Sequence, residues 1–250
     1  MVSIRHRMIK GIPTLELTEE GQENAVLPII FFYHGWQSEK ELVLTQGRKL
    51  VKKGFRVILP DSKNHGERKY QVNAIPSLTF WDTIQANIAE FGMLEQFYQD
   101  RDLIKEGQIG VGGYSMGAMT TGALLTHHPE IKAATIIMGT PSLISYAKLV
   151  RDHAKRNNIY VPNDLEDLTS WIKHYDLDTN IETLKNRPLL FWHGTEDERI
   201  PYSQSWDFYQ KYKDNPNASQ TAFITGYKAG HLVETRLMDK IANFFEYYVQ

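Results

Sequence analysis

Short apolar runs alternate with longer amphipathic segments along the chain. Five of these runs are rich in β-branched or aromatic residues: Pro28–Tyr33, Phe55–Pro60, Ile109–Tyr114, Ala133–Met138 and Pro188–Trp192. Their nearly continuous apolar character is typical of strands that are buried on both faces. We therefore expect an α/β fold in which helices cover a mostly parallel sheet.

The segments between these runs carry apolar residues at helical spacing. They predict helices over Lys40–Lys53, Trp81–Lys105, Ser115–His128 and Leu232–Val249. The first two are followed by Gly54 and Gly107, and the third by Pro129. Glycine and proline at these positions are typical of helix ends.

Further segments complete the predicted organisation. Val2–Ile9 and Thr14–Leu17 indicate a leading antiparallel hairpin, and Thr221–Thr225 indicates the last strand. About 45 residues separate the strands that end near Gly139 and begin near Pro188, more than an ordinary crossover needs. They contain three expected short helices: Ser142–Lys155, Leu165–His174 and Leu177–Leu184. We predict a single domain over residues 1–250, with a small helical cap inserted at residues 141–187.

The composition excludes several classes of function. Lys and Arg number 28 against 30 Asp and Glu, a net charge of -2, so no basic surface for nucleic acid is expected. The chain has no cysteine, which excludes disulfides, thiolate metal sites and a cysteine nucleophile. No run approaches the roughly 18 apolar residues of a membrane span, and the N-terminal segment lacks a signal-peptide core. We expect a cytoplasmic protein that binds neither nucleic acid nor membrane.

Residues 113–117 read G-Y-S-M-G, which has the form G-x-S-x-G, where a predicted strand ends and a predicted helix begins. A serine on such a sharp turn holds its hydroxyl above the edge of the sheet. The glycines at either end let the strand and the helix approach without a Cβ clash. Ser115 is therefore the candidate nucleophile, and the alternative is a serine that only caps the helix.

A serine nucleophile needs a base, and the base needs an acid to orient it. Acidic residues follow the predicted strand Pro188–Trp192, and Glu196, Asp197 and Glu198 are similar candidates from position alone. His231 comes later in the chain, in a loop between the last predicted strand and the C-terminal helix. The order of serine, acid and histidine is the one that this kind of site requires.

The other histidines have more ordinary interpretations. His34 and His193 each end a predicted strand and precede a glycine, so we expect them to brace turns through hydrogen bonds. A zinc site formed by His34, His65 and His193 is disfavoured, because no H-x-x-x-H pair or clustered carboxylate accompanies them. We expect no metal and no cofactor.

Acyl transfer builds negative charge on the carbonyl oxygen, so backbone N–H groups must already point to it. The residue after the nucleophile, Met116, is expected to supply one N–H group. Trp36, in the turn after Pro28–Tyr33, is expected to supply the second, and its indole is a candidate wall of the acyl pocket.

With these residues in place, the sequence resembles the α/β-hydrolase superfamily over nearly its whole length. The segments that carry the resemblance are 31–35 (FFYHG), 60–66 (PDSKNHG), 113–117 (GYSMG), 193–197 (HGTED) and 230–231 (GH). The H-G-x-x-D-x-x-[IV]-P pattern of that superfamily selects Asp197 as the triad acid. The chain is most similar to small bacterial esterases related to the prolyl oligopeptidase catalytic domain and to dienelactone hydrolases.

The resemblance implies an α/β-hydrolase fold with a mostly parallel eight-stranded sheet, carboxylesterase activity and no cofactor. Two departures matter: the chain has no room for the propeller domain of prolyl oligopeptidases, and Ser115 stands where well-known dienelactone hydrolases have cysteine. The expected function is hydrolysis of small to medium acyl esters by Ser115, His231 and Asp197. Peptide or amide hydrolysis by the same triad, and ligand binding without catalysis, are the alternatives.

The expected partner is a small-molecule ester, and the sequence leaves a homodimer open. Aromatic residues of the predicted cap are candidates for the wall of the substrate pocket, together with Trp36: Tyr146, Tyr160, Trp171 and Tyr175. Aromatic residues at helical spacing also pack a cap onto a sheet, which is the alternative for each of them.

Overall fold

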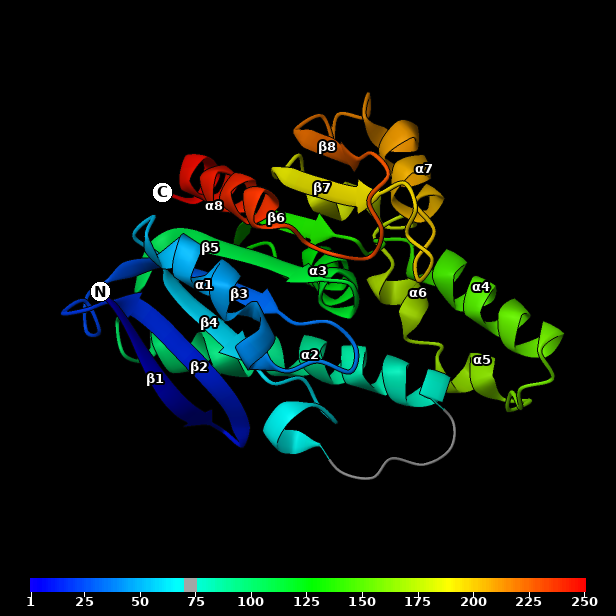
Figure 1. Cartoon of the computed structure of the whole chain (residues 1–250), viewed down its shortest axis with the longest axis horizontal. Helices are drawn as coiled ribbons and strands as arrows, with labels where there is room; N and C mark the ends of the chain where they lie inside the picture. The colour runs from blue at the N-terminus through cyan, green and yellow to red at the C-terminus, as the bar shows by residue number, and fades with distance from the viewer. Residues whose placement is uncertain (70–75) are drawn as a thin grey trace.

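The computed structural model describes residues 1–69 and 76–250. Eight strands form one sheet in the order β1-β2-β4-β3-β5-β6-β7-β8 (Figure 1). The first strands, β1 and β2, pair antiparallel with each other, β2 pairs antiparallel with β4, and the remaining neighbours are parallel. The strand bounds are Val2–Ile9, Ile12–Glu19, Leu27–Tyr33, Arg56–Pro60, Ile104–Tyr114, Ile131–Ile137, Leu189–Gly194 and Thr221–Gly226 for β1 to β8. The mostly parallel sheet predicted from the apolar runs is confirmed.

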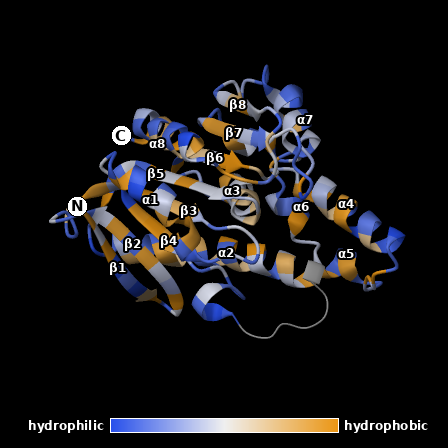
Figure 2. Ribbon diagram, in the orientation of Figure 1, coloured by the Kyte–Doolittle hydropathy of each residue, from blue (hydrophilic) through white to orange (hydrophobic). Residues whose placement is uncertain are grey.

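Helices cover both faces of this sheet (Figure 1). On one face, α1 (Leu44–Val51) and α8 (Thr235–Val249) pack against each other and against the central strands. On the other face lie α2 (Pro76–Gln99) and α3 (Met116–His127), and α7 (Ser203–Tyr212) contributes Phe208 to the same core. Each face therefore has its own apolar cluster, and strands such as β4 and β6 are largely hydrophobic (Figure 2).

Several helix bounds differ from the expectation. The segment predicted as one helix over Lys40–Lys53 divides into a 3-10 turn, η1 (Lys40–Val43), and α1. The helix predicted to reach Lys105 ends at Gln99, and β5 begins at Ile104. Asp102 adopts a left-handed conformation, with φ of 52°, and its N–H donates to the Gln99 carbonyl. The chain therefore reverses before Gly107, and the prediction that Gly107 closes the helix is wrong.

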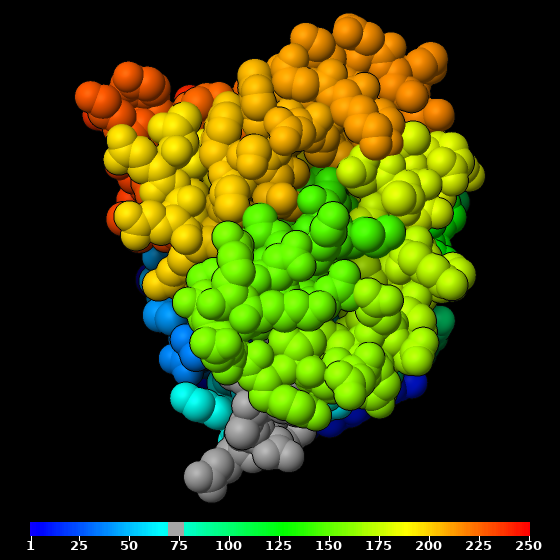
Figure 3. Space-filling view, turned by 90° about the vertical axis from the view of Figure 1, so that its right-hand side faces the viewer, coloured from blue at the N-terminus to red at the C-terminus, as the bar shows by residue number. Residues whose placement is uncertain are grey.

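Residues 141–187 connect β6 to β7 through α4 (Leu143–Arg156), α5 (Leu165–Leu168), α6 (Ile172–Tyr175) and a 3-10 turn, η3 (Ile181–Leu184). Buried Asp176 accepts a hydrogen bond from the Ile144 N–H at 2.7 Å, so it holds the first turn of α4 in place. Seen toward the carboxyl ends of the parallel strands, this segment covers the middle of the surface in green to yellow-green (Figure 3). It therefore overlies the sheet edge at which catalytic groups of open α/β folds gather.

The final helix α8 begins at Thr235, three residues later than the expected Leu232. Leu232 is instead 72% exposed, in the loop before the helix. Within residues 1–69 and 76–250, no helix has the length and apolar character that a membrane crossing requires.

Candidate active site

Ser115 lies on a strained turn between β5 and α3. Its φ of 55° and ψ of -114° fall outside the regions that ordinary side chains prefer. The turn is fixed because the Ser115 N–H donates to the Ile137 carbonyl of β6 at 3.0 Å. The Ser115 side chain makes no capping hydrogen bond to α3. The hydroxyl is therefore free of the structural role that a helix-capping serine would have.

Two glycines make this turn sterically feasible. A Cβ placed on Gly117 would lie 2.3 Å from the Tyr33 carbonyl oxygen, and a Cβ on Gly113 would lie 2.4 Å from the Gly117 carbonyl carbon. Both distances are far below van der Waals contact. The first turn of α3 therefore packs directly on the end of β3, which brings Ser115 beside the loop that follows β3.

Asp197 lies in the loop after β7 and is buried. Its Oδ1 accepts the N–H groups of Arg199 and Ile200 at 2.9 and 3.0 Å. Its Oδ2 lies 2.7 Å from His231 Nδ1 and 3.2 Å from His193 Nε2. Burial by itself would raise the pKa of Asp197, but hydrogen bonds from His193, His231 and Ile200 outweigh it and hold the pKa below its usual range. Asp197 is therefore a carboxylate at neutral pH.

Glu196 and Glu198 flank Asp197 and are both exposed. The structure thus separates three acids that position alone left as similar candidates. The loop is anchored to the turn after β8, because the Glu196 N–H donates to the Ala229 carbonyl at 2.9 Å. This bond brings the acid loop and the His231 loop together, although 34 residues separate Asp197 from His231.

Ser115 and His231 line the same cavity, which has a volume of about 640 Å³. The Asp197 carboxylate accepts a hydrogen bond from Nδ1–H of His231, which leaves Nε2 as the ring nitrogen that can take a proton. The structure therefore brings the three predicted residues to one edge of the sheet: the acid behind the histidine, and the histidine and the serine at the cavity.

The loop after β3 passes next to Ser115. A Cβ on Gly35 would lie 3.5 Å from the Ser115 Cβ, so the backbone at residues 35 and 36 borders the serine. Met116 is the first residue of α3 and is buried. The first N–H groups of an α-helix lack partners within the helix. The Gly35–Trp36 backbone and the first turn of α3, which begins at Met116, therefore both border Ser115.

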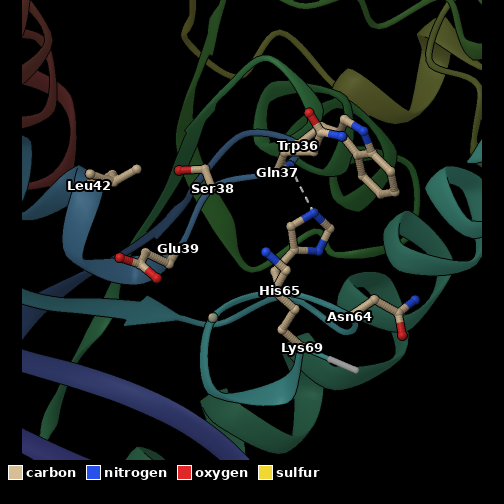
Figure 4. A pocket seen from close by; sticks show the side chains of 9 residues that line it. Trp36, Gln37, Ser38, Glu39, Leu42, Asn64, His65 and Lys69 are labelled. Carbon is tan, nitrogen blue, oxygen red and sulfur yellow. Dashed lines mark hydrogen bonds between the residues drawn. The ribbon is translucent and has the colours of Figure 1, made fainter. Parts of the chain in front are cut away.

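Two buried histidines brace this loop. His34 Nε2 accepts the Ser62 N–H at 3.0 Å, and its Nδ1 lies 2.8 Å from the Gly35 carbonyl. His65 Nε2 accepts the Gln37 N–H at 3.0 Å, as the dashed line in Figure 4 shows. Burial lowers the pKa of His34 to about 4, so the neutral ring that this pattern requires is the stable form at neutral pH. The predicted bracing role of His34 fits these contacts.

His193 braces a different turn. Its ring nitrogens lie 2.9 Å from Ser205 Oγ and 2.9 Å from the Ile200 carbonyl, and Nε2 also faces Asp197. His193 therefore contacts α7 and the loop after β7, whereas His34 and His65 brace the loop after β3.

Within the described part of the chain, the side chains placed to hold a metal ion lie elsewhere: Glu95, His128 and Glu130. Glu95 and Glu130 border a cavity beside Ile104, near the start of β5. Burial, together with Glu130, raises the pKa of Glu95 to about 7. Because of this raised pKa, Glu95 binds a proton more readily than an ordinary glutamate, which reduces the repulsion between the two carboxyl groups.

The walls of the 640 Å³ cavity are mostly apolar and aromatic. Of the candidate pocket residues, Trp36, Tyr146 and Tyr160 line it. Trp171 and Tyr175 do not line it: Trp171 packs on Trp81, and Tyr175 stacks on His127 with ring centroids 4.3 Å apart. These two aromatic side chains join the segment of residues 141–187 to α2 and α3.

Sequence reasoning missed several lining residues. Phe80 and Trp81 come from the first turns of α2, and α4 adds Val150, His153 and Ala154. The aromatic start of α2 was visible in the sequence, but nothing there indicated which end of the helix reaches the serine. Arg199 also lines the cavity, only two residues after Asp197. Burial, and to a smaller extent Asp197, raises the pKa of Tyr146 to about 12.

Comparison with known proteins agrees with this architecture. Residues 85–250 match the family model of the prolyl oligopeptidase family. Over the full length of both chains, the sequence is 34% identical to "Putative esterase YitV" of Bacillus subtilis (strain 168) and 26% identical to "Esterase YjfP" of Escherichia coli (strain K12). The crystal structure of TT1662 from Thermus thermophilus superposes with a TM-score of 0.78 at 17% identity, covering 100% of this chain and 99% of that one.

Proposed function

The chain belongs to the prolyl oligopeptidase family of α/β-hydrolase folds, and we propose that it is a serine carboxylesterase that cleaves small to medium acyl esters. The observation that carries the proposal is the arrangement of Ser115 on a strained turn and His231, bound to buried Asp197, at one cavity. The esterase names of the two relatives that match over their full length support the ester specificity.

The first step is attack of Ser115 Oγ on the ester carbonyl carbon while His231 Nε2 takes the hydroxyl proton. The negative charge that develops on the carbonyl oxygen meets the N–H groups of Trp36 and Met116. His231 then gives its proton to the leaving alcohol as the carbon–oxygen bond breaks, which leaves an acyl group on Ser115. Water then attacks the acyl carbon while His231 takes a proton from it. The bond from that carbon to Ser115 Oγ breaks, His231 returns the proton to Oγ, and the carboxylic acid leaves.

Asp197 acts through His231. Its Oδ2 fixes the ring with Nδ1–H toward the carboxylate, and its negative charge stabilises the imidazolium that forms in each step. Because two backbone N–H groups hold Oδ1, the carboxylate cannot rotate away when the histidine becomes charged. His34 and His65 keep the oxyanion loop in place without taking part in proton transfer.

The substrate range follows from the cavity. Its volume of about 640 Å³ accommodates a small or medium acyl group. The aromatic walls from α2 and α4, at Phe80, Trp81 and Tyr146, favour an apolar acyl chain over a strongly hydrated one. We propose that residues 141–187 act as a cap that sets the upper limit on chain length.

Amide hydrolysis by the same residues is the second candidate, because the matching family model is that of oligopeptidases. The two activities differ in the leaving group. An amine is a poorer leaving group than an alcohol, so His231 must protonate the amide nitrogen before the carbon–nitrogen bond breaks. Paired substrates with one acyl group, a p-nitrophenyl ester and the matching p-nitroanilide, separate the candidates. The carboxylesterase proposal expects the ester to be favoured by several orders of magnitude in kcat/KM.

The proposal is tested by labelling with a fluorophosphonate, which reacts only with an activated serine hydroxyl. Mass spectrometry should place the adduct on the peptide containing Ser115, and the His231→Ala variant should label far more slowly. A protein that stays unlabelled although it is folded would contradict the proposal and favour ligand binding without catalysis.

A further inference from the structure

The cavity beside Ser115 has an uneven charge. Among its described lining residues there is no carboxylate, and Arg199 is the sole Lys or Arg side chain. The rest of the lining is apolar or uncharged apart from two histidines, His153 and the triad residue His231. An anionic group that entered this cavity would therefore meet one fixed cation and no fixed negative charge from the lining.

Arg199 is exposed, and within residues 1–69 and 76–250 no hydrogen bond, ion pair or aromatic ring engages its guanidinium. Its backbone N–H, in contrast, donates to Asp197 Oδ1 at 2.9 Å. The two acids next to it in the loop, Glu196 and Glu198, are exposed and do not line the cavity. By contrast, the guanidinium of Arg68 is paired within the protein: it donates two hydrogen bonds to the Glu90 carboxylate.

The backbone contact also fixes the position of the Arg199 backbone relative to Asp197 and His231. Asp197 holds both the Arg199 backbone and the His231 ring, so the guanidinium starts from the same short loop that orients the base. The aromatic wall of the cavity comes from α2 and α4 instead. One side of the site is therefore apolar, and another carries a free guanidinium.

We propose that the site is selective for acyl esters that carry a carboxylate group remote from the scissile bond, with Arg199 as the residue that binds this carboxylate. The inference rests on the proposed esterase function. A guanidinium binds a carboxylate through two parallel, charge-assisted hydrogen bonds. The uncharged part of the substrate contacts Phe80, Trp81 and Tyr146.

The carboxylate can belong to the acyl part or to the alcohol part of the ester, and both have the same chemistry toward Arg199. The two sources are separated by four substrates, which form two pairs of an acidic ester and its neutral counterpart. Phenyl succinate carries the charge on the acyl side, and phenyl butyrate is its neutral counterpart. The butyrate ester of 4-hydroxybenzoate carries the charge on the leaving group, and the butyrate ester of methyl 4-hydroxybenzoate is its neutral counterpart.

The experiment measures kcat/KM for each acidic ester relative to its neutral counterpart, with wild type, Arg199→Gln, Arg199→Lys and the control Arg101→Gln. Arg101 is an exposed arginine that stacks on Phe97 and does not line the cavity. We expect Arg199→Gln to lower the ratio for at least one acidic ester by about tenfold or more, the scale of one charge-assisted contact. Arg199→Lys should keep part of the preference, and Arg101→Gln should keep all of it.

Salt provides an independent readout, because screening weakens an exposed ion pair. Raising NaCl from 0.05 to 0.5 M should lower the wild-type ratio and leave the Arg199→Gln ratio unchanged. Ester hydrolysis with ratios that do not differ between wild type and Arg199→Gln overturns this inference and leaves the esterase function standing. A folded wild type that cleaves none of the four esters contradicts the esterase function itself.

Discussion

His231 Nδ1 lies 2.7 Å from Asp197 Oδ2, and the other oxygen of that carboxylate is held by two backbone N–H groups. The carboxylate is thus fixed by its own loop before it meets the histidine. This relationship connects the ends of β7 and β8, which are neighbours in the sheet. Parallel pairing of adjacent strands is what brings an acid and a base from distant parts of the sequence into contact.

Replacing Asp197 by Asn should lower kcat by about 10²- to 10⁴-fold with little loss of fold, because the amide no longer selects the Nδ1–H tautomer of His231. Glu196→Gln and Glu198→Gln are matched controls, since both acids are exposed in the same loop. Steady-state kinetics on one p-nitrophenyl ester compares the three. If kcat of either control falls as far as that of Asp197→Asn, the assignment of Asp197 as the acid that orients His231 is wrong.

Gly117→Ala should destabilise the protein by at least about 2 kcal/mol, because the new Cβ would overlap the Tyr33 carbonyl oxygen and force the start of α3 away from β3. Gly92→Ala is the control, because its Cβ would meet nothing within 4 Å on an exposed part of α2. That variant should gain about 0.5 to 1 kcal/mol from the better helix former. Urea unfolding gives both values, and equal stability of the two variants would refute the tight packing at the turn.

The stability of the protein should fall between pH 6.5 and pH 4, in part because of His34. Burial lowers the pKa of His34 to about 4 in the fold, so the unfolded chain binds the proton more readily in this interval. The contribution is complete above pH 6.5, is lost as the pH falls toward 4, and amounts to about 3 kcal/mol.

Other groups also titrate in this interval, so the test of His34 is a difference measurement. Burial raises the pKa of Glu95 to about 7, which makes stability change in the opposite direction as the pH falls. Urea unfolding of wild type and His34→Gln at pH 7.5 and pH 4.5 gives the difference in unfolding free energy between the two proteins at each pH, and the change in this difference is the contribution of His34. The gap between the two proteins should narrow at the lower pH, and a gap that stays constant would contradict the buried neutral imidazole.

Tyr146→Ala should shift the preferred acyl chain toward longer esters, because Tyr146 comes from α4 and its ring forms part of the cavity wall. The ratio of kcat/KM for the octanoate and butyrate p-nitrophenyl esters should rise several-fold. Tyr175→Ala is the comparison, since that ring stacks on His127 instead of the cavity. If both variants change the ratio equally, the cap aromatic residues act on chain length only through the stability of the cap.

The apolar runs predicted the parallel strands well because strands buried on both faces leave a continuous hydrophobic record in the sequence. Helix ends were harder to place. The predicted helix through Lys105 overran its true end at Gln99 because a left-handed Asp102 reverses the chain, and an aspartate at this position gives a weaker signal than glycine. The later start of α8 has a similar origin, since Leu232 is apolar yet exposed beside the cavity.

The residues proposed to act in catalysis could be identified from the sequence because each stands in a short motif at the end of a strand. The pocket could not be predicted to the same extent. Tyr146 and Tyr175 are both aromatic residues on short helices of residues 141–187, and only the packing directs one to the cavity and the other to His127. No motif marked Arg199 as a binding residue. Its proposed role depends on the lack of carboxylates among the described residues that line the cavity, and these residues come from parts of the chain that are distant in sequence.

The most direct test of the account is the hydrolysis of p-nitrophenyl esters from acetate to octanoate by wild type and Ser115→Ala, with the exposed Ser170→Ala as control. The account predicts wild-type activity with an optimum at short or medium chains, a loss of at least about 10³-fold in kcat for Ser115→Ala, and no change for Ser170→Ala. Wild-type rates retained by a purified Ser115→Ala enzyme would contradict the proposed nucleophile.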